Sequence, residues 1–409
     1  MALQVAVIGG GAAGFFGAIN IARMRPQAVV TIYEKSSKLL SKVKISGGGR
    51  CNVTHHCFEI DELIQHYPRG AKWLRTPFQQ FSVPDTIQWF QTRNVILKTE
   101  KDGRIFPISD DSQTIIDCFL KEAQKYCVNI QKNHELTALK ALDDGSGFEL
   151  TFNHQKKLTA HVVIVTIGGH SKTHAYDFLK EIGHTIVPPV PSLFTFNIPN
   201  NPITNLRGIS LPEVTVRIQN TKWEESGPFL ITHWGFSGPA VLKLSAWAAR
   251  QLADIKYEFQ IALRWISQKE HLLRQEIELW KQKGKQKTIL NRNPLFLPMR
   301  LWEFLLYKSQ ISPNKLWGEI SIKDINRLVH CLTNDVYQVK GKTTFKEEFV
   351  TCGGVMLQEV DPFSMQSKLH KNLYFAGEVL DIDGITGGFN FQAAWTTAYV
   401  ASLHIAQLV

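Results

Sequence analysis

The first thirty-four residues alternate between apolar runs and a glycine turn, a pattern that predicts a strand, a helix and a second strand. Gln4–Ile8 is an apolar run with the length of a buried strand. A glycine turn follows, and the apolar residues after it continue as a helix to about Arg23. The next run, AVVTIYE, is rich in β-branched residues and ends in Glu34. This order is typical of a nucleotide-binding βαβ unit.

Further along, the pattern predicts more strands and then a change of architecture. Residues 136–142, 148–152 and 162–166 are short runs with strand character. The proline-rich stretch IVPPVPSLFTFNIPNNP, residues 186–202, is typical of a linker that leaves a domain. The β-rich runs after it suit a small barrel or sandwich, and they read EVTVRIQ, PFLITH and KYEFQIALR.

Helical patterns follow in the second region. GPAVLKLSAWAARQLA predicts a helix with Pro239 in its first turn. Two capping-box patterns, S-x-x-E at 267–270 and S-x-x-D at 321–324, each predict a helix start, and the first of these helices runs to about Lys283. Residues 267–334 are therefore predicted to form a helical insert, after which VYQVKGKTTF returns to the barrel through a hairpin.

These patterns divide the chain into three predicted parts. At 409 residues it exceeds one ordinary core, so more than one domain is expected. The fold class is α/β, with a discontinuous Rossmann-like domain interrupted by a β-barrel that carries the helical insert. The predicted boundaries are 1–190 plus 350–409 for the nucleotide-binding domain, 191–266 plus 335–349 for the barrel, and 267–334 for the insert.

Composition is that of an ordinary folded protein with a basic bias. Hydrophobic residues make up 44% and charged residues 20%, which argues against disorder. The longest apolar run, Val5–Ala22, is broken by glycines and predicts no membrane span. The N-terminus shows no signal-peptide pattern, so we expect a cytoplasmic protein. The net charge of +10 indicates either a solvated basic face or a polyanionic partner such as RNA.

The glycine turn matches the dinucleotide fingerprint G-x-G-x-x-G. Gly9 makes the tight turn, Gly11 lets a pyrophosphate approach the backbone, and Gly14 lets helix and strand pack closely. Glu34 follows Gly14 by twenty residues, the position from which an acid binds the adenosine ribose. The order of strand, turn, helix, strand and acid predicts a bound dinucleotide.

A second pattern near the C-terminus, NLYFAGEVLDIDGITGGFNFQAAWTTAYVA, distinguishes FAD from NAD. A predicted strand, 373–376, ends in Gly377–Glu378, and Gly387–Gly388 opens an apolar helix. A strand that ends in Gly and an acid is how many flavoproteins hold the ribityl chain and pyrophosphate, and the helix N-terminus suits the flavin N1–C2=O region. We therefore predict FAD as the cofactor.

Five motifs in this order carry a family resemblance: GGGAAG, KLLSKVKISGGGRCNVT, THWGFSGPAVL, VTCGGV and AGEVLDIDGITGGFNFQ. The chain resembles the BaiN/YhiN-like family of NAD(P)/FAD-dependent oxidoreductases over nearly its whole length. The resemblance implies a GR2-type FAD-binding domain and an enzyme that reduces or oxidises an enone, a small amine or a ribosomal RNA uridine. It implies cofactor contacts from Gly9, Gly11, Ala13, Gly14, Glu34, Lys35, Lys42, Gly47, Gly48, Gly49, Arg50, Leu136, Thr166, Gly168, Gly377, Glu378, Asp383, Gly388, Phe389 and Asn390.

The stretch SGGGRCNVTHHC, residues 46–57, has three interpretations. A redox disulfide is disfavoured because Cys51 and Cys57 lie six positions apart, too far for a helical segment to close without a bend. A metal site at His55, His56 and Cys57 is disfavoured because adjacent side chains diverge and no fourth ligand group is close in sequence, so no metal is predicted. The remaining interpretation is a wall of the flavin site, in which the glycines let the backbone approach a flat ring.

Three residues of that wall are the candidate catalytic groups. Arg50 is a fixed cation for negative charge on reduced flavin or on the substrate, and Asn52 can hydrogen-bond a ring edge or a substrate carbonyl. Cys51 is either a small packing residue or a proton donor to a substrate carbon.

The predicted reaction is hydride transfer through FAD to an activated C=C bond, with NAD(P)H as a transient donor because no second fingerprint holds it. Amine oxidation and a flavin-stabilised RNA-binding module without turnover stay open. The substrate choice lies between a small enone and ribosomal RNA uridine, and the positive charge favours RNA. The basic run WKQKGKQK in the insert is either a solvated face or a phosphate-binding surface.

Overall fold

The computed structural model describes residues 2–343 and 350–408. The chain folds into two compact units. Unit 1 comprises Met1–Ser192 and Phe345–Val409, and unit 2 comprises Leu193–Thr344. The predicted barrel stretch 344–349 lies outside the described residues, and the separation of 267–334 as a domain of its own stays a prediction.

Unit 1 is built on a five-stranded sheet in the order β20-β10-β1-β2-β6. Every neighbouring pair in it is parallel. Central parallel strands are buried on both faces, which is why β1 is apolar and buried from Val5 to Ile8. The strands are β1 (Gln4–Ile8), β2 (Val29–Glu34), β6 (Asn129–Lys132), β10 (Val162–Val165) and β20 (Leu373–Phe375).

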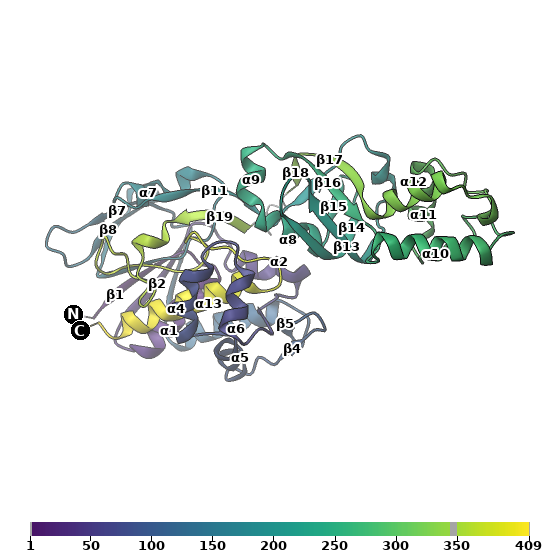
Figure 1. The fold of residues 1–409 in the computed structure, drawn as a ribbon. Coiled ribbons are helices and arrows are strands. Elements are labelled where there is room, and N and C mark those ends of the chain that lie inside the picture. The colour runs from purple at the N-terminus through teal and green to yellow at the C-terminus, as the bar shows by residue number, and fades with distance from the viewer. Residues whose placement is uncertain (1, 344–349, 409) are drawn as a thin grey trace. The chain divides into compact units, whose positions relative to one another are not determined.

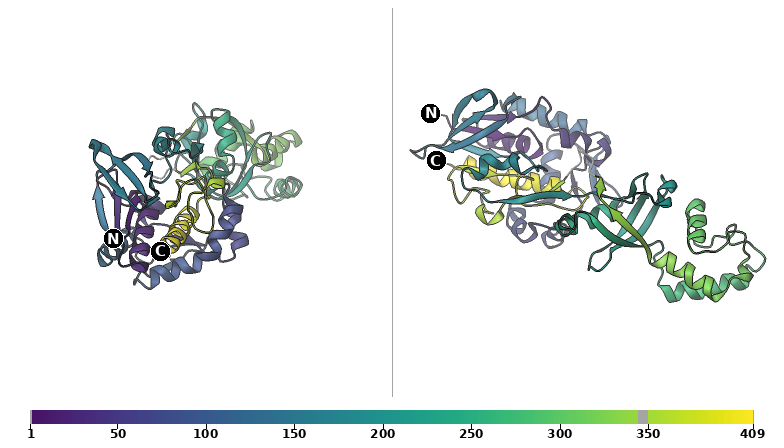
Figure 2. Two further views of the ribbon diagram at one scale, coloured as in Figure 1. Left: turned by 90° about the vertical axis from the view of Figure 1, so that its left-hand side faces the viewer. Right: turned by 90° about the horizontal axis from the view of Figure 1, so that it is seen from above.

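The helices of unit 1 bury an aromatic core against this sheet. Phe16 of α1 lies 5.3 Å from Trp395 of α13 between ring centroids, and Phe119 of α6 lies 5.6 Å from Trp395. Both ribbon views show α13, in yellow, beside α1, in purple (Figures 1 and 2). The helices are α1 (Ala12–Met24), α2 (Ser41–Gly49), α3 (Ile60–Leu63), α4 (Ala71–Gln80), α5 (Val83–Gln91), α6 (Gln113–Lys125), α7 (Asp177–Lys180) and α13 (Phe389–Ala406).

Two three-stranded antiparallel sheets also belong to unit 1. The first, in the order β7-β8-β9, lies beside the end of β2, where the Tyr33 and Phe152 rings pack at a tilt with 4.7 Å between centroids. The second has the order β3-β5-β4 and follows α2 along the chain. The strands are β3 (Thr54–His55), β4 (Leu97–Thr99), β5 (Arg104–Pro107), β7 (Leu136–Ala141), β8 (Phe148–Phe152) and β9 (Lys157–Ala160).

The first part of the proline-rich stretch predicted as a linker is a strand, β11 (Ile186–Ser192), and the chain leaves unit 1 at Ser192, within that stretch. β11 pairs antiparallel with β19 (Val350–Val355), and the register shifts between Val187 and Val190. Proline lacks an N–H but is tolerated at bulges and at sheet edges, and a two-stranded sheet consists of edges. Gly353 makes the approach possible, because a Cβ there would lie 2.6 Å from the carbonyl oxygen of Pro188.

Unit 2 is a sheet in the order β17-β16-β13-β14-β15-β12-β18. β17 and β18 stand at opposite ends of this order, yet only Gly341 separates them in the chain. The predicted hairpin is therefore wrong: Gly341, at φ 84°, bends one continuous strand that closes the sheet into a barrel. The strands are β12 (Thr195–Asn197), β13 (Ser210–Ile218), β14 (Glu224–Ile231), β15 (Gly235–Ser237), β16 (Glu258–Arg264), β17 (Asp335–Lys340) and β18 (Lys342–Thr343).

The helices of unit 2 start as predicted in two cases and differently in a third. α8 (Pro239–Trp247) has its proline at the first turn and is followed by α9 (Ala249–Asp254). α12 (Ile322–Thr333) begins with the predicted capping box, in which Asp324 accepts from the Ser321 backbone N–H at 3.0 Å. α10 (Glu270–Lys283) does not begin at the predicted cap, because extended Lys269 occupies the position before the helix.

The helical insert consists of α10, α11 (Met299–Lys308) and α12 around apolar side chains that include Trp302 and Trp317. Figure 1 shows these three helices grouped at one end of the barrel strands. Short 3₁₀ turns occur at Ile64–His66, Asn153–Gln155, Thr173–Tyr176, Pro202–Leu206, Trp317–Glu319 and Leu357–Glu359. Of the helices in the described parts of the chain, none has the length and apolar character needed to cross a bilayer.

Candidate functional site

The glycine turn between β1 and α1 leaves open space in front of a helix N-terminus. A Cβ on Gly9 would lie 2.5 Å from the Thr166 carbonyl oxygen, and one on Gly14 would lie 1.9 Å from the Gly9 carbonyl oxygen. A Cβ on Gly11 would have no atom within 4 Å. Thr166 supports the turn, since its hydroxyl donates to the Ile8 carbonyl at 2.9 Å. Free N–H groups facing open space form a site for an anion such as a pyrophosphate.

Glu34 lies beside this turn. Its Oε2 accepts from the Gly10 backbone N–H at 2.8 Å, and its Oε1 accepts from the Ser36 backbone N–H at 2.9 Å. Its carbonyl accepts from the His134 N–H at 2.9 Å, which brings the start of β7 at Leu136 to the end of β2. The predicted ribose and adenine residues therefore lie in one region.

Lys42 and Glu378, two predicted cofactor residues, bind each other. Lys42 Nζ lies 2.7 Å from Glu378 Oε2, and Glu378 Oε1 accepts from the Thr351 N–H at 2.8 Å. The Thr351 hydroxyl is buried and has no hydrogen-bond partner among the described residues. Gly377, at φ 77°, lets β20 approach α1, because a Cβ there would lie 2.9 Å from the Cβ of Ala13.

His170 follows Gly168 by two residues and lies near Lys35 and Lys42. Burial and the positive charges of Lys35 and Lys42 lower the pKa of His170 to about 4, so the imidazole is neutral at pH 7. Gly168 has φ 74° and open space at its Cβ position. This part of the site therefore combines exposed backbone with a neutral imidazole and a lysine–glutamate pair.

The glycines of SGGGRCN form a left-handed loop at the end of α2. Gly47, Gly48 and Gly49 have φ of 58°, 70° and 85°, a backbone region that residues other than glycine rarely adopt. No atom lies within 4 Å of a Cβ built on Gly48 or Gly49. The loop therefore presents bare backbone, as a flat ligand ring requires.

The three candidate catalytic residues have different surroundings. Arg50 Nη1 lies 2.6 Å from Glu100 Oε1 and 3.5 Å from Asp110 Oδ1, so two carboxylates compensate its charge. Cys51 is fully buried in the apolar core of unit 1, and burial raises the pKa of its thiol to about 12. Its position favours the packing interpretation over the proton-donor one.

Asn52 differs from both, because its side chain is buried without a hydrogen-bond partner. Its Oδ1 has none among the described residues. The amide lies against Gly388, where a Cβ would stand 2.9 Å from Asn52 Oδ1. Gly388 is the N-cap of α13, so Asn52 and the positive end of a helix dipole face one place. An unsatisfied buried polar atom is costly unless a ligand completes it.

The last predicted residues take structural partners beside Gly388. Asp383 is fully buried and binds Arg69 and the Ser192 hydroxyl. The side chain of Asn390 bonds both the N–H and the carbonyl of Gly384, each at 2.8 Å. The Phe389 ring stacks on the His66 ring with 4.3 Å between centroids. These contacts fix the loop that leads into α13.

The structure reveals groups that the sequence reasoning missed. Cys57 Sγ, a Glu62 carboxylate oxygen and a ring nitrogen of His66 lie within 4.8 Å of one another. The sequence pattern pointed only to the consecutive His55, His56 and Cys57, whereas the chain turns so that Glu62 and His66 come back to Cys57. Thr351 and Arg69 carried no local signal at all. The six cysteines are free.

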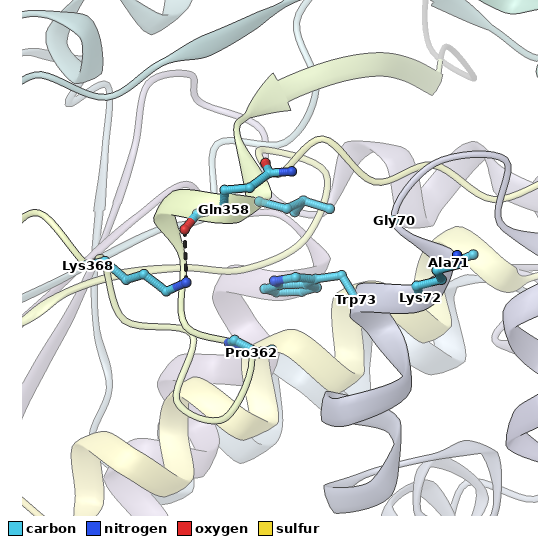
Figure 3. A pocket seen from close by; sticks show the side chains of 8 residues that line it. Gly70, Ala71, Lys72, Trp73, Gln358, Pro362 and Lys368 are labelled. Atoms are coloured by element: carbon cyan, nitrogen blue, oxygen red, sulfur yellow. Dashed lines mark hydrogen bonds between the residues drawn. The ribbon is translucent and has the colours of Figure 1, made fainter.

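A groove of about 540 Å³ lies elsewhere on unit 1 and contains none of the predicted residues. It is lined by Gly70, Trp73, Gln358, Pro362 and Lys368, among others. Figure 3 shows the Trp73 indole in this groove and the bond from Lys368 Nζ to the Gln358 carbonyl, which measures 2.9 Å.

The surroundings of the predicted cofactor residues are compatible with bound FAD. Open backbone occurs where a pyrophosphate and a flat ring are expected, at Gly11, Gly48, Gly49 and Gly168. Two buried polar atoms, Asn52 Oδ1 and Thr351 Oγ1, lack the partners that a cofactor would supply. Two helix N-termini, those of α1 and α13, begin at glycines among these residues. The role of each residue towards the cofactor stays a prediction.

Comparisons with known proteins agree on one family. The profile described as "HI0933-like protein Rossmann domain" matches residues 3–404. A "3-dehydro-bile acid delta(4,6)-reductase" of Clostridium scindens is 26% identical, over 99% of both chains. Two proteins named "Ribosomal RNA dihydrouridine synthase" are also similar. The one from Haemophilus influenzae is 28% identical over 98% of both chains. The one from Escherichia coli is 29% identical over 97% of this chain and 96% of that protein.

Solved structures with the same fold are flavoenzymes. A flavocytochrome c3 fumarate reductase matches with a TM-score of 0.52 at 16% identity, covering 99% of this chain and 78% of that one. A 3-ketosteroid-delta4-(5alpha)-dehydrogenase from Rhodococcus jostii RHA1 matches with a TM-score of 0.51 at 11% identity, covering 99% and 97%. At these identities the likeness concerns the fold, and it confirms the predicted Rossmann-like class.

Proposed function

Because the chain belongs to the HI0933-like family and is an FAD-dependent oxidoreductase, we propose that it reduces the C5=C6 bond of a uridine in ribosomal RNA, with NAD(P)H as the electron donor. The balance is uridine, NAD(P)H and a proton giving dihydrouridine and NAD(P)⁺. One ring carbon receives the hydride and its neighbour receives the proton. Such a substrate would place the enzyme in the cytoplasm.

The observation that supports this substrate is a full-length likeness to two proteins named for it, combined with a net charge of +10. A small neutral metabolite gains little from such a charge, whereas an RNA ligand releases counterions on binding to cations. The C5=C6 bond is conjugated with a carbonyl, which makes it an acceptor of hydride. The target base must be accessible or flipped, at a cost of a few kcal/mol.

Bound FAD would supply the hydride chemistry, accepting a hydride from NAD(P)H and passing it to carbon. The chain's own residues would bind and orient it. The α1 N-terminus at Gly11 would hold the pyrophosphate, and Glu34 the ribose. Asn52 would accept a hydrogen bond from a ring N–H, and the α13 N-terminus would stabilise negative charge beside it. Arg50, paired with Glu100, would hold the glycine loop in place.

A matched pair of substitutions separates Cys51 from Asn52. Cys51→Ala should leave turnover within about threefold of wild type, because we assign a packing role to its thiol, which lies in the apolar core. Asn52→Leu should keep the fold but weaken FAD binding by about tenfold, the value of one hydrogen bond. FAD titration and steady-state rates measure both. A hundredfold lower rate in FAD-loaded Cys51→Ala would restore the thiol as proton donor.

The direct test in solution uses purified protein, NADH or NADPH, and ribosomal RNA transcribed without modifications. We expect the reduced nucleotide to bleach the flavin absorbance, and RNA to restore it with formation of dihydrouridine detected by mass. Bleaching by small amines alone would contradict reduction as the reaction. Reoxidation by enone substrates with none by RNA would move the function to the second candidate.

That second candidate is reduction of a small enone. It is favoured by the likeness to the bile acid reductase, which covers 99% of both chains. Both candidate reactions require the same FAD site and transfer a hydride to a C=C bond conjugated with a carbonyl. They differ in the surface of the protein that binds the substrate.

A further inference from the structure

The segment from Lys281 to Arg300, here called the basic segment, holds six basic residues and no acidic one. It connects α10 to α11 in the helical insert (Figure 1). The insert as a whole, residues 267–334, has twelve Lys and Arg against six Asp and Glu, so it carries +6 of the chain's +10. The positive charge is therefore concentrated in one part of unit 2.

The basic side chains of this segment are not used in ion pairs. Lys308 and Lys315, outside the segment, bind Asp335 and Asp324. Within the described residues, by contrast, the segment has no ion pair at any of its six cations, which are Lys281, Lys283, Lys285, Lys287, Arg292 and Arg300. Lys283, Lys285, Lys287 and Arg292 are exposed. Their charge is available to an anionic partner.

Phe296 belongs to the same segment as these cations, and its ring lies in solvent. It is 93% exposed, and its backbone has φ 54°, a left-handed conformation that a bulky residue rarely adopts. Both the exposure of the ring and the backbone conformation cost free energy. A ring displayed at such a cost indicates a ligand that covers it.

The backbone around Phe296 is held firmly. The Asn293 side chain accepts from the Leu295 N–H at 3.2 Å and donates to the Leu297 carbonyl at 2.6 Å. The next residue, Leu297, is buried. Two buried indoles fix the rest of the segment: that of Trp302 donates to the Ile289 carbonyl at 2.9 Å, and that of Trp317 to the Arg292 carbonyl at 3.1 Å.

We propose that the basic segment binds single-stranded RNA, with Phe296 stacked on an unpaired base and Lys283, Lys285, Lys287 and Arg292 on flanking phosphates. An exposed aromatic ring among unpaired cations is the combination that single-stranded nucleic acid binds, since every base has a face to stack and every linkage an anion. The inference rests on the proposed function, because it supplies the surface that holds the ribosomal RNA substrate.

The test measures fluorescence anisotropy of the full-length protein with an unstructured, uridine-rich RNA of about 20 nucleotides at several salt concentrations. Phe296→Gly should weaken binding by about fivefold or more with an unchanged salt slope. It should also leave the thermal midpoint equal or higher, because glycine relieves the left-handed backbone. Replacing the four flanking cations by Gln should lower the salt slope by about 0.7 for each lost phosphate contact.

Matched controls lie on the same insert. Lys269→Gln and Lys323→Gln remove exposed lysines elsewhere, and Tyr307→Ala removes another exposed ring. Each should stay within about twofold of wild-type affinity, since none belongs to the basic segment. Equal losses in the controls and in the segment variants would overturn the proposal, because they would show general charge attraction.

The outcomes separate this surface from the proposed function. If wild-type protein forms dihydrouridine while the segment variants bind and turn over as wild type does, the surface is overturned and the function stands. If the segment variants lose RNA binding but wild-type protein forms no dihydrouridine, RNA binding by the basic segment is supported and uridine reduction is contradicted. Absence of RNA binding by the wild type, or binding of an apolar protein partner through Phe296 instead, overturns the surface.

Discussion

Replacing Gly11 by valine is expected to abolish FAD binding while the protein stays folded. The backbone of Gly11, at φ −91° and ψ −165°, suits any residue, and a Cβ there meets no atom within 4 Å. The valine side chain would instead fill the space in front of the α1 N-terminus, where the pyrophosphate is expected. FAD affinity should fall by about 100-fold or more, equivalent to roughly 3 kcal/mol. Flavin absorbance of the purified variant measures it.

Substitutions at two other glycines of α1 show which effects come from losing a glycine rather than from blocking the cofactor site. Gly17→Ala should keep both fold and flavin, because its Cβ would make an ordinary contact of 3.6 Å with Ile164. Gly14→Ala should damage the fold, because its Cβ would lie 1.9 Å from the Gly9 carbonyl oxygen. A Gly11→Val protein that purifies yellow with bound FAD would show that the dinucleotide site lies elsewhere.

Replacing Arg69 by alanine is expected to destabilise the protein by about 3–5 kcal/mol, because it leaves a buried carboxylate without its cation. Asp383 is fully buried, and Arg69 binds it together with the Ser192 hydroxyl. Urea unfolding measures the loss. The double variant Arg69→Ala/Asp383→Asn should recover part of it, because an amide carries no charge to bury.

The loss should depend on pH in a defined direction. Burial raises the pKa of Asp383, and the Arg69 guanidinium opposes that rise. Without Arg69 the folded-state pKa rises further above that of the unfolded chain. A raised carboxyl pKa favours the fold below the unfolded pKa, and this contribution is lost as the pH rises through the folded pKa. The deficit of Arg69→Ala should therefore be smaller near pH 4 than at pH 7.5. An equal loss of unfolding free energy at both pH values would contradict the explanation by a buried, charged Asp383.

The parts of the fold that local geometry dictates could be predicted from the sequence. The strand at Gln4–Ile8 and the Ser321 cap both form as expected, because each depends on residues next to one another. The strand at Ile186–Ser192 was missed because three prolines normally end a strand, and only Gly353, far along the chain, makes its pairing possible. The bend at Gly341 was mistaken for a hairpin for a similar reason: the closure of the barrel is not a local property.

The site shows the same division. Gly9 and Gly14 have the close approaches that the fingerprint predicts, because a Cβ at either would lie within 2.5 Å of a backbone carbonyl oxygen. Gly11 differs, since a Cβ there would have open space. The pairing of Arg69 with Asp383, 314 positions apart, left no trace in either local pattern. The carboxylates that bind Arg50 follow it by 50 and 60 positions, so its charge looked uncompensated in the sequence.

Mapping of dihydrouridine in ribosomal RNA by mass spectrometry tests the central claim most directly. The RNA comes from four strains: one with the gene, one without it, one in which wild type complements the deletion, and one in which Gly11→Val does. The account predicts that one dihydrouridine disappears with the gene, returns with wild type, and does not return with Gly11→Val. A map that stays the same in all strains would contradict ribosomal RNA as the substrate.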